Sequence, residues 1–198
     1  MDGGSGPEEA AERAAAAAQV FVADPQAPQV DEEDSRHLVR VLRLRPGEVV
    51  VAADGKGGWC RCLFRGADDP AGLLDPDGPL CRERPPDVAL TVAFAPAKGD
   101  RPEWVVQKLT ELGIDRIVPL ATDRSVVRWD TGRAERALER LRRVAREAAA
   151  QSRRTWLPEV GAVTTVSGLV ADAGRSGDVR LAQLGGEPPA AGEAAGGK

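Results

Sequence analysis

The feature that most constrains the fold of this chain is an alternation of apolar runs with amphipathic stretches after residue 86. Residues 87–95 form a continuous apolar run, which suits a strand buried on both faces. An amphipathic stretch, residues 101–112, and a second strand, residues 114–120, follow. Residues 131–151 then keep one apolar stripe at helical spacing, and residues 178–184 predict a third strand. Strands alternating with helices predict a parallel α/β sheet with right-handed crossovers.

The sequence before this alternation is typical of a small β-rich domain. DSRHLVRVLRLRPGE, residues 34–48, predicts one short basic helix that Pro46-Gly47 ends. Residues 48–64 contain two β-rich runs around Asp54-Gly55, which is the pattern of a hairpin. GPLCRE, residues 78–83, predicts one further strand.

Composition indicates where the domains begin and end. Residues 1–18 are rich in Gly, Glu and Ala and predict an acidic leader that is disordered or weakly helical. A β-rich domain is expected over residues 19–84, an α/β domain over residues 87–184, and a flexible tail over residues 185–198. The sequence has no signal peptide and no apolar run near the roughly 20 residues of a membrane span, so we expect a cytoplasmic protein without a membrane partner.

The charge is unevenly distributed, which changes what the chain is expected to bind. The formal net charge is −4, but residues 1–35 hold nine acids against one base and carry −8. The remainder therefore carries +4, because −4 minus −8 is +4. A basic body behind an acidic leader allows nucleic acid as a partner, since binding responds to local fields.

The three cysteines support neither a disulfide framework nor a metal site. Their number is odd, their spacing is not that of metal ligands, and His37 is the one histidine. Cys60 and Cys62 are spaced to share one strand face, where we expect buried thiols. We therefore predict no metal.

A helix face and the loop before it offer the first candidates for chemistry. Gln107, Lys108 and Glu111 share one face of the helix expected over residues 101–112. A lysine and a glutamate side by side on an exposed face are usually a solvated pair. The preceding loop, AKGDR, lacks the full glycine pattern of a nucleotide-binding turn, which weakens a generic nucleotide-binding function.

Arginines make the second candidate group. Eight arginines and three glutamates lie between Arg133 and Arg154, and arginine suits bidentate phosphate contact. A merely solvated arginine-rich face is the alternative. Glu147 and Gln151 share a face at the end of this helix, where Arg153 and its neighbours emerge. Polar groups that converge at the end of a crossover helix are placed as ligand sites are in α/β sheets.

Four blocks of this sequence together resemble one family. They are RHLVRVLRLRPGE, AKGDRPEWVVQKLTELGIDRIVPL, DRSVVRW and EAAAQSRRTWLPEV. In this order and spacing they are similar to the ribosomal RNA small subunit methyltransferase E family, over roughly residues 20–184. The resemblance implies a PUA-like β-barrel RNA-binding domain followed by a SPOUT-type α/β methyltransferase domain with a C-terminal knot. It also implies a homodimer that methylates N3 of one uridine in 16S ribosomal RNA of the small subunit, using S-adenosylmethionine.

The resemblance also implies roles for individual residues. The catalytic candidates are two carboxylates as proton acceptors and two residues that orient the base, namely Glu111, Glu147, Lys108 and Gln151. The RNA-binding candidates are Arg36, His37, Arg40, Arg43, Arg124, Ser125, Arg128, Ser152, Arg153 and Arg154. His37 taken alone is more often a structural histidine, whereas within RHLVRVLRLRPG a structural role and an RNA-binding role have equal weight.

The sequence departs from the family pattern near its end. Family members continue with a GPEGG-like loop and a later LG..ILR.ETA-like block, which form the knot and most of the cofactor pocket, and this sequence contains neither. We therefore expect a C-terminally truncated relative whose cofactor-binding residues are unknown. The alternative to a methyltransferase is a non-catalytic RNA-binding remnant of such an enzyme.

Overall fold

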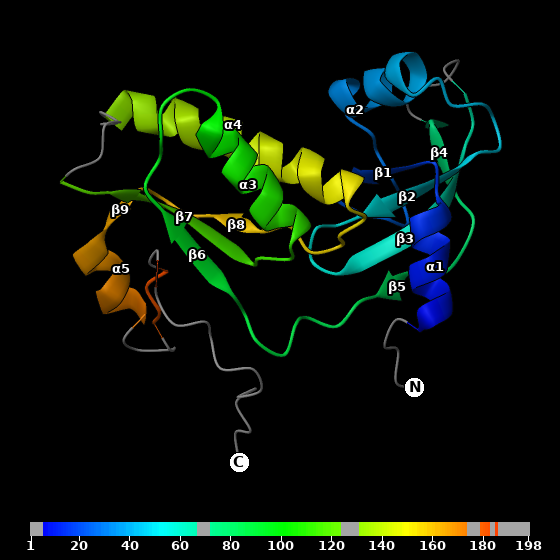
Figure 1. Ribbon diagram of the computed structural model, residues 1–198. Helices are drawn as coiled ribbons and strands as arrows, with labels where there is room; N and C mark the ends of the chain where they lie inside the picture. Colours follow the sequence, from blue (N-terminus) through cyan, green and yellow to red (C-terminus); the bar gives the residue numbers. More distant parts are fainter. Residues whose placement is uncertain (1–5, 67–71, 124–130, 174–178, 183–184, 186–198) are drawn as a thin grey trace. The chain divides into compact units, whose positions relative to one another are not determined.

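A computed structural model describes residues 6–66, 72–123, 131–173, 179–182 and 185. The chain divides into two units, residues 1–164 and 165–198. The boundary expected between residues 84 and 87 falls inside the first unit, which holds both the β-rich half and the α/β half of the chain (Figure 1).

The β-rich half is one five-stranded sheet. Its strands are β1 (Ala18–Phe21), β2 (Val49–Ala53), β3 (Gly58–Phe64), β4 (Leu74–Pro76) and β5 (Cys81–Arg82). They pair in the order β1-β2-β3-β4, and β5 also pairs with β3. β2 and β3 are antiparallel, which confirms the predicted hairpin, whereas β1 runs parallel to β2. Within the described residues these pairings make a sheet, and its closure into a barrel stays a prediction.

Both faces of this sheet are buried. Cys60 and Cys62 lie on one face, free and fully covered, as their period-two spacing predicted. Burial raises the pKa of the Cys62 thiol to about 12. The opposite face packs Phe21 and Trp59 against Ala149 of the long helix described below. This second face joins the β-rich half to the α/β half.

The leader is partly helical. Of the two outcomes that its composition predicted, disorder and a weak helix, residues Pro7–Ala15 form a helix, α1. Arg13 explains the order, because its Nη1 lies 2.8 Å from Glu83 Oε2 and its guanidinium lies over the Trp59 ring, 5.6 Å from the centroid. These partners are distant in sequence, so leader composition alone did not predict them.

The predicted basic helix is shorter and less regular than its pattern indicated. It consists of α2 (Glu32–Arg36) and a π-helical turn, η1 (His37–Val41). Asp31 caps α2, since its side chain accepts a hydrogen bond from Asp34 N at 2.7 Å. The wider π turn displaces the expected apolar stripe, so that Leu38 is buried and Val41 is exposed.

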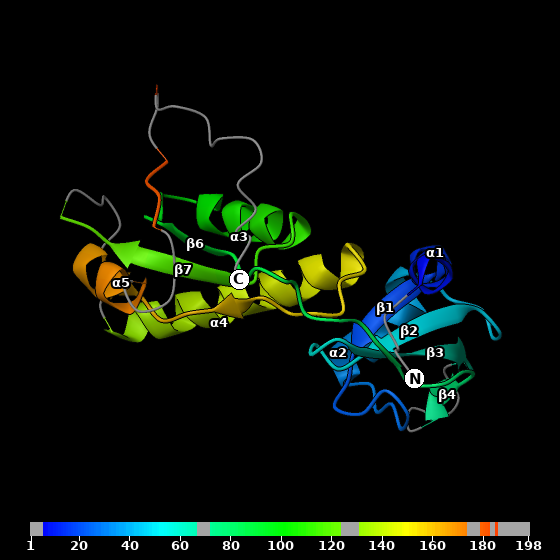
Figure 2. The same ribbon diagram turned by 90° about the horizontal axis from the view of Figure 1, so that it is seen from below.

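The α/β half confirms the predicted parallel sheet. Its strands β6 (Thr91–Phe94), β7 (Arg116–Ala121) and β8 (Glu159–Val160) lie in the order β6-β7-β8, and all are parallel. β6 is only half-buried, contrary to the expectation of a strand covered on both faces. Helices α3 (Arg101–Glu111) and α4 (Thr131–Gln151) lie side by side (Figures 1 and 2). Gly113, with φ of 92°, directly follows the end of α3, where the predicted amphipathic stretch, residues 101–112, also ends.

The apolar stripe of α4 builds the core of this half. Leu138, Leu141 and Ala145 pack with Val106 of α3 and Ile117 of β7. Besides α3, α4 contacts β8 and β1, so this one helix spans both sheets of the first unit. A function that needs both halves therefore has α4 as its natural support.

The remaining elements are short. They are β9 (Thr164–Thr165) and α5 (Val166–Ala173). The strand predicted over residues 178–184 is wrong for residues 179–182, which are described and are not in a strand. Within the described ranges, none of the helices has both the length and the apolar character that crossing a membrane requires.

Candidate functional site

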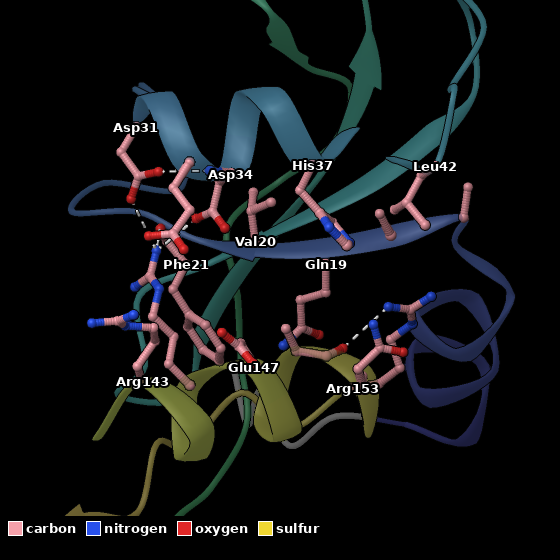
Figure 3. Close-up of a pocket in the computed structure, with 16 residues that line it drawn as sticks. Gln19, Val20, Phe21, Asp31, Asp34, His37, Leu42, Arg143, Glu147 and Arg153 are labelled. Atoms are coloured by element: carbon pink, nitrogen blue, oxygen red, sulfur yellow. Dashed lines mark hydrogen bonds and ion pairs between the residues drawn. The ribbon is translucent and has the colours of Figure 1, made fainter. Parts of the chain in front are cut away.

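A pocket of about 420 Å³ opens between β1, the α2–η1 segment and α4 (Figure 3). Gln19 and Phe21 come from β1, and Asp34 and His37 come from the α2–η1 segment. The remaining wall belongs to the second half of α4. The volume is in the range of small-ligand sites.

One face of α4 forms the longest wall of the pocket. Arg143, Glu147 and Gln151 follow one another at intervals of four residues, and each lines the pocket. The opposite stripe of the helix is held in the α/β core. Packing of the apolar stripe therefore fixes the direction of the polar face. The sequence prediction that Glu147 and Gln151 share a face agrees with this placement.

Arg146 closes one side of the pocket. Its Nη2 donates to Asp34 Oδ2 at 2.7 Å and to the Phe21 carbonyl at 2.8 Å, and its guanidinium lies over the Phe21 ring at 5.4 Å. Burial raises the pKa of Asp34, and the hydrogen bond from Arg146 opposes that rise without cancelling it. Sequence reasoning counted Arg146 among the arginines but missed Phe21 and Asp34, whose contact with the helix no local pattern signals.

Gln19 is the second residue that sequence reasoning missed. Its side-chain Nε2 donates to the Arg154 carbonyl at 2.6 Å, and the residue is only 5% exposed. Its Oε1 is buried and has no hydrogen-bond partner among the described residues. A buried acceptor without a partner is rare in folded proteins and calls for an explanation.

Arg153 lies beside Gln19 at the end of α4 (Figure 3). It has a positive φ of 59°, and its guanidinium donates to the Ala150 carbonyl at 3.1 Å and to the Ala16 carbonyl at 2.7 Å. Burial lowers the pKa of its guanidinium. Since arginine has five N–H donors, others stay available to a ligand.

Arg154 has a different environment from its neighbour. Its guanidinium donates to the carbonyls of Thr110 at 3.0 Å and Ile114 at 2.9 Å, where α3 has ended. Burial lowers its pKa, which nearby Asp115 opposes. Its side chain is 16% exposed, so we assign it to holding the end of α3. Ser152 is also engaged internally, since its Oγ donates to the Ala148 carbonyl at 2.7 Å.

The polar face of α3 is separate from the pocket. Lys108 Nζ lies 2.7 Å from Glu111 Oε2, and Gln107 Nε2 donates to Glu111 Oε1 at 3.0 Å. The hydrogen bond from Lys108 lowers the pKa of the Glu111 carboxyl. Neither Lys108 nor Glu111 lines the pocket. The structure therefore divides the four catalytic candidates into two pairs.

The arginines of the α2–η1 segment are exposed. Arg36 pairs with Glu32 at 2.7 Å, Arg40 lies on η1, and Arg43 follows it with a positive φ of 54°. His37, from the same segment, lines the pocket. The remaining candidates, Arg124, Ser125 and Arg128, lie outside the described residues.

The pocket combines both signs of charge. Carboxylates come from Asp31, Glu33, Asp34 and Glu147, and guanidinium groups come from Arg143, Arg146 and Arg153. In the part of the chain that the structure describes, no group of three or more His, Cys, Asp or Glu side chains is arranged to hold a metal ion. A lining of guanidinium donors together with carboxylate and amide acceptors suits a ligand that is anionic at one end and donates hydrogen bonds at the other.

Two family models match the chain in the same order as the two sheets. The model of an RNA methyltransferase PUA domain matches residues 30–70, and that of an RNA methyltransferase domain matches residues 84–188. The first model therefore includes α2 and η1, and the second includes α4.

Two curated relatives carry one name, ribosomal RNA small subunit methyltransferase E. The Mycobacterium tuberculosis protein is 35% identical over 147 residues, which are 71% of this chain and 53% of the relative. The Bacillus subtilis protein is 33% identical over 130 residues, which are 65% of this chain and 50% of the relative. The chain spans about half the length of the curated relatives it matches.

A solved structure has the same fold. It is the Neisseria gonorrhoeae ribosomal RNA small subunit methyltransferase E bound to S-adenosyl methionine, with a TM-score of 0.62 and 24% identity. The match covers 77% of this chain and 64% of that protein.

Proposed function

Because this chain belongs to the ribosomal RNA small subunit methyltransferase E family, we propose that it holds small-subunit ribosomal RNA for methylation, with one unpaired nucleotide in the pocket beside α4. The meeting of two sequence segments in that pocket carries the proposal. His37 comes from the segment that the PUA model matches, and Glu147 and Gln151 come from the segment that the methyltransferase model matches.

The finer assignment follows the resemblance of the sequence. We propose that the methylated atom is N3 of a uridine in 16S ribosomal RNA and that the working protein is a cytoplasmic homodimer with a closed barrel and a C-terminal knot. S-adenosylmethionine, which is bound in the Neisseria structure, would supply an electrophilic methyl group.

The described pocket is not a built site for that cofactor. Its sulfonium centre is positively charged, and the lining sets the guanidinium groups of Arg143, Arg146 and Arg153 against carboxylates, so no sign of charge is selected. The Asp34 carboxylate is already bonded to Arg146. We therefore assign the pocket to the RNA and derive no step through the cofactor.

Residues of the pocket can contact the phosphate, a uracil oxygen and the N3 proton of a bound uridine. Arg143 and Arg153 offer N–H donors to phosphate at the rim of the pocket. Gln151 offers an amide to a uracil oxygen, one helical turn beyond Glu147. Glu147 offers a carboxylate that can accept the proton of N3. N3 must lose this proton when it forms a bond to the methyl carbon. Exposing the base costs a few kcal/mol, less where it is already unpaired.

Glu147 is a better proton acceptor than Glu111 on two grounds. Its carboxylate has no hydrogen-bond or ion-pair partner among the described residues and lines the pocket. Glu111 has its pKa lowered by Lys108, which makes it a weaker base, and lies outside the pocket.

The test measures methyl transfer to unmodified 16S ribosomal RNA from labelled S-adenosylmethionine, with primer extension to find an N3-methylated uridine. Glu147→Gln is expected to lower the rate about 10²-fold, because the amide cannot take the proton. Glu139→Gln removes an exposed carboxylate two turns earlier on α4, outside the pocket, and is expected to leave the rate unchanged. Equal rates for both variants would rule out the role of Glu147.

RNA binding without methyl transfer is the second candidate function, and the poor fit of the cofactor to the described pocket favours it. Calorimetry with S-adenosylmethionine separates the two functions. Cofactor binding together with ribosomal RNA binding supports the enzyme. Ribosomal RNA binding alone supports the non-catalytic module.

A further inference from the structure

The buried Gln19 oxygen gives the pocket a feature that neither the family resemblance nor the proposed reaction assigns. Oε1 lies in the wall between β1 and α4 and has no partner among the described residues (Figure 3). An unpaired buried acceptor destabilises a fold, so a donor brought by a ligand would be favoured there.

The orientation of this amide is fixed. Its Nε2 donates to the Arg154 carbonyl at 2.6 Å, and turning the amide over would place Oε1 against that carbonyl, acceptor to acceptor. Arg154 is itself held by the carbonyls of Thr110 and Ile114. The end of α3 therefore keeps Nε2 toward Arg154 and leaves Oε1 for another partner.

Burial limits the kind of donor that fits. Gln19 is only 5% exposed, and an ammonium group brought to its Oε1 would lose hydration that one neutral amide oxygen replaces poorly. A neutral hydroxyl or amino group loses less. The donor is therefore neutral, and it belongs to a ligand whose anionic part the pocket arginines attract.

The position of Arg153 identifies that donor. Arg153 Nη2 donates to the carbonyl of Ala16, three residues before Gln19, while Gln19 donates to the carbonyl of Arg154, the residue after Arg153. A phosphate at Arg153 and a donor at Gln19 are therefore close neighbours. In a ribonucleotide the 2′-hydroxyl is the neutral donor next to the 3′-phosphate, and DNA lacks it.

We propose that Gln19 Oε1 accepts a hydrogen bond from the ribose 2′-hydroxyl of the nucleotide in the pocket, which makes this site selective for RNA over DNA. The proposal rests on the proposed function, because it takes the ligand to be ribosomal RNA. It deepens that function by adding a specificity-determining residue, Gln19, and a positioning residue, Arg154.

The test compares three single-stranded hexanucleotides of uridine by fluorescence anisotropy at one salt concentration. They carry 2′-hydroxyl, 2′-deoxy or 2′-fluoro sugars, and the fluoro sugar keeps an RNA-like pucker without a donor. The unaltered protein is expected to bind the ribo form about tenfold more tightly than either of the others, as one hydrogen bond to a buried acceptor predicts.

Variants assign the preference to Gln19. Gln19→Met keeps the length of the side chain and removes the acceptor. The variant is expected to bind the ribo form more weakly than the unaltered protein does, so that its affinities for the ribo and deoxy forms differ by no more than about twofold. Glu139→Gln, outside the pocket, is expected to keep it. Circular dichroism checks the fold of each variant, and the three-sugar comparison on the unaltered protein stands without any variant.

Each other outcome has a definite meaning. Equal binding of the ribo and deoxy forms, or a ribo preference that the fluoro form shares, would overturn the role of the 2′-hydroxyl and leave the proposed function standing. A preference that Gln19→Met retains would overturn the assignment to Gln19. Failure of all three oligonucleotides and of ribosomal RNA to bind would overturn the proposed function as well.

Discussion

The polar face of α3 and the pocket face of α4 carry similar side chains in different surroundings. On α3, Lys108 and Glu111 bond to each other on an open surface. On α4, Arg143 and Glu147 have no hydrogen-bond or ion-pair partner among the described residues and face a wall formed by β1 and the α2–η1 segment. A satisfied pair has little left to offer a ligand, whereas unpaired groups in a pocket do.

The difference comes from what lies opposite each helix. The apolar stripe of α4 packs into the α/β core, and Ala149 packs against Phe21 and Trp59 of the first sheet. This contact brings the polar face of α4 against β1. Lys108 and Glu111, on the polar face of α3, do not line this pocket. Spacing along a helix gives a shared face, and long-range packing decides whether that face becomes a site.

The largest expected effect comes from breaking the link between the two helices. Arg154→Met removes the donors that hold the end of α3 and leaves the carbonyls of Thr110 and Ile114 without them. The free energy of unfolding is expected to fall by about 2–4 kcal/mol, because each lost charged hydrogen bond leaves a partly buried acceptor. Urea denaturation measures the free energy of unfolding of the variant and of the unaltered protein. Arg136→Met, an exposed arginine on α4, is the control, and an equal loss there would contradict the assignment.

A smaller effect separates the two faces by their affinity for RNA. Arg143→Ala in the pocket wall is expected to weaken binding of 16S ribosomal RNA about fivefold. It is also expected to reduce the slope of log affinity against log salt concentration by about the amount that one phosphate contact contributes. Arg101→Ala, at the exposed start of α3, is expected to change neither. Filter binding over a series of salt concentrations measures both variants. Equal losses would mean that RNA binds by overall charge, without a preferred face.

Local patterns predicted much of the fold. The hairpin at Asp54-Gly55, the bounds of α4 and the glycine end of α3 all follow from period, turn residues and caps. Leader composition left disorder and a weak helix open, because Arg13 of α1 finds its partners, Glu83 and Trp59, far away in the sequence. The strand expected near residue 180 did not follow from the sequence, since apolar composition over a short run does not establish strand pairing.

The site was predictable only in part, because local patterns do not reveal contacts between segments that are distant in sequence. Glu147 and Gln151 stand out because they belong to one amphipathic helix. Gln19 and Asp34 become site residues only when β1 and α2 meet α4, more than 100 residues later in the chain. Arg153 and Arg154 are adjacent in sequence, yet one lines the pocket and the other holds α3. The break in the helix after Gln151 turns them apart.

Titration sharpens the comparison, because the two regions shift carboxyl pKa values in opposite directions. Burial raises the pKa of Asp34 in the pocket, while Lys108 lowers that of Glu111 on α3. The stabilising contribution of Asp34 is therefore fully present below its unfolded pKa and is lost as the pH rises through its folded pKa. That of Glu111 is present above its unfolded pKa and is lost as the pH falls through its folded pKa. Carbon-13 NMR of the two carboxyl groups measures both midpoints, and Asp34→Asn identifies its signal. A titration midpoint of Asp34 below that of Glu111 would contradict the burial of Asp34 and the pairing of Glu111 with Lys108.

The smallest expected effect tests whether the α3 face is only a solvated pair. Lys108→Gln removes the cation that lowers the pKa of Glu111, so the Glu111 midpoint is expected to move upward. The urea midpoint and the affinity for 16S ribosomal RNA are expected to stay unchanged, because the pair is exposed and solvent replaces the lost contact. NMR titration, urea denaturation and filter binding on one preparation measure all three. Loss of RNA affinity without loss of stability would mean that Lys108 and Glu111 belong to the RNA-binding site. The α3 and α4 faces would then not differ in their contribution to RNA binding.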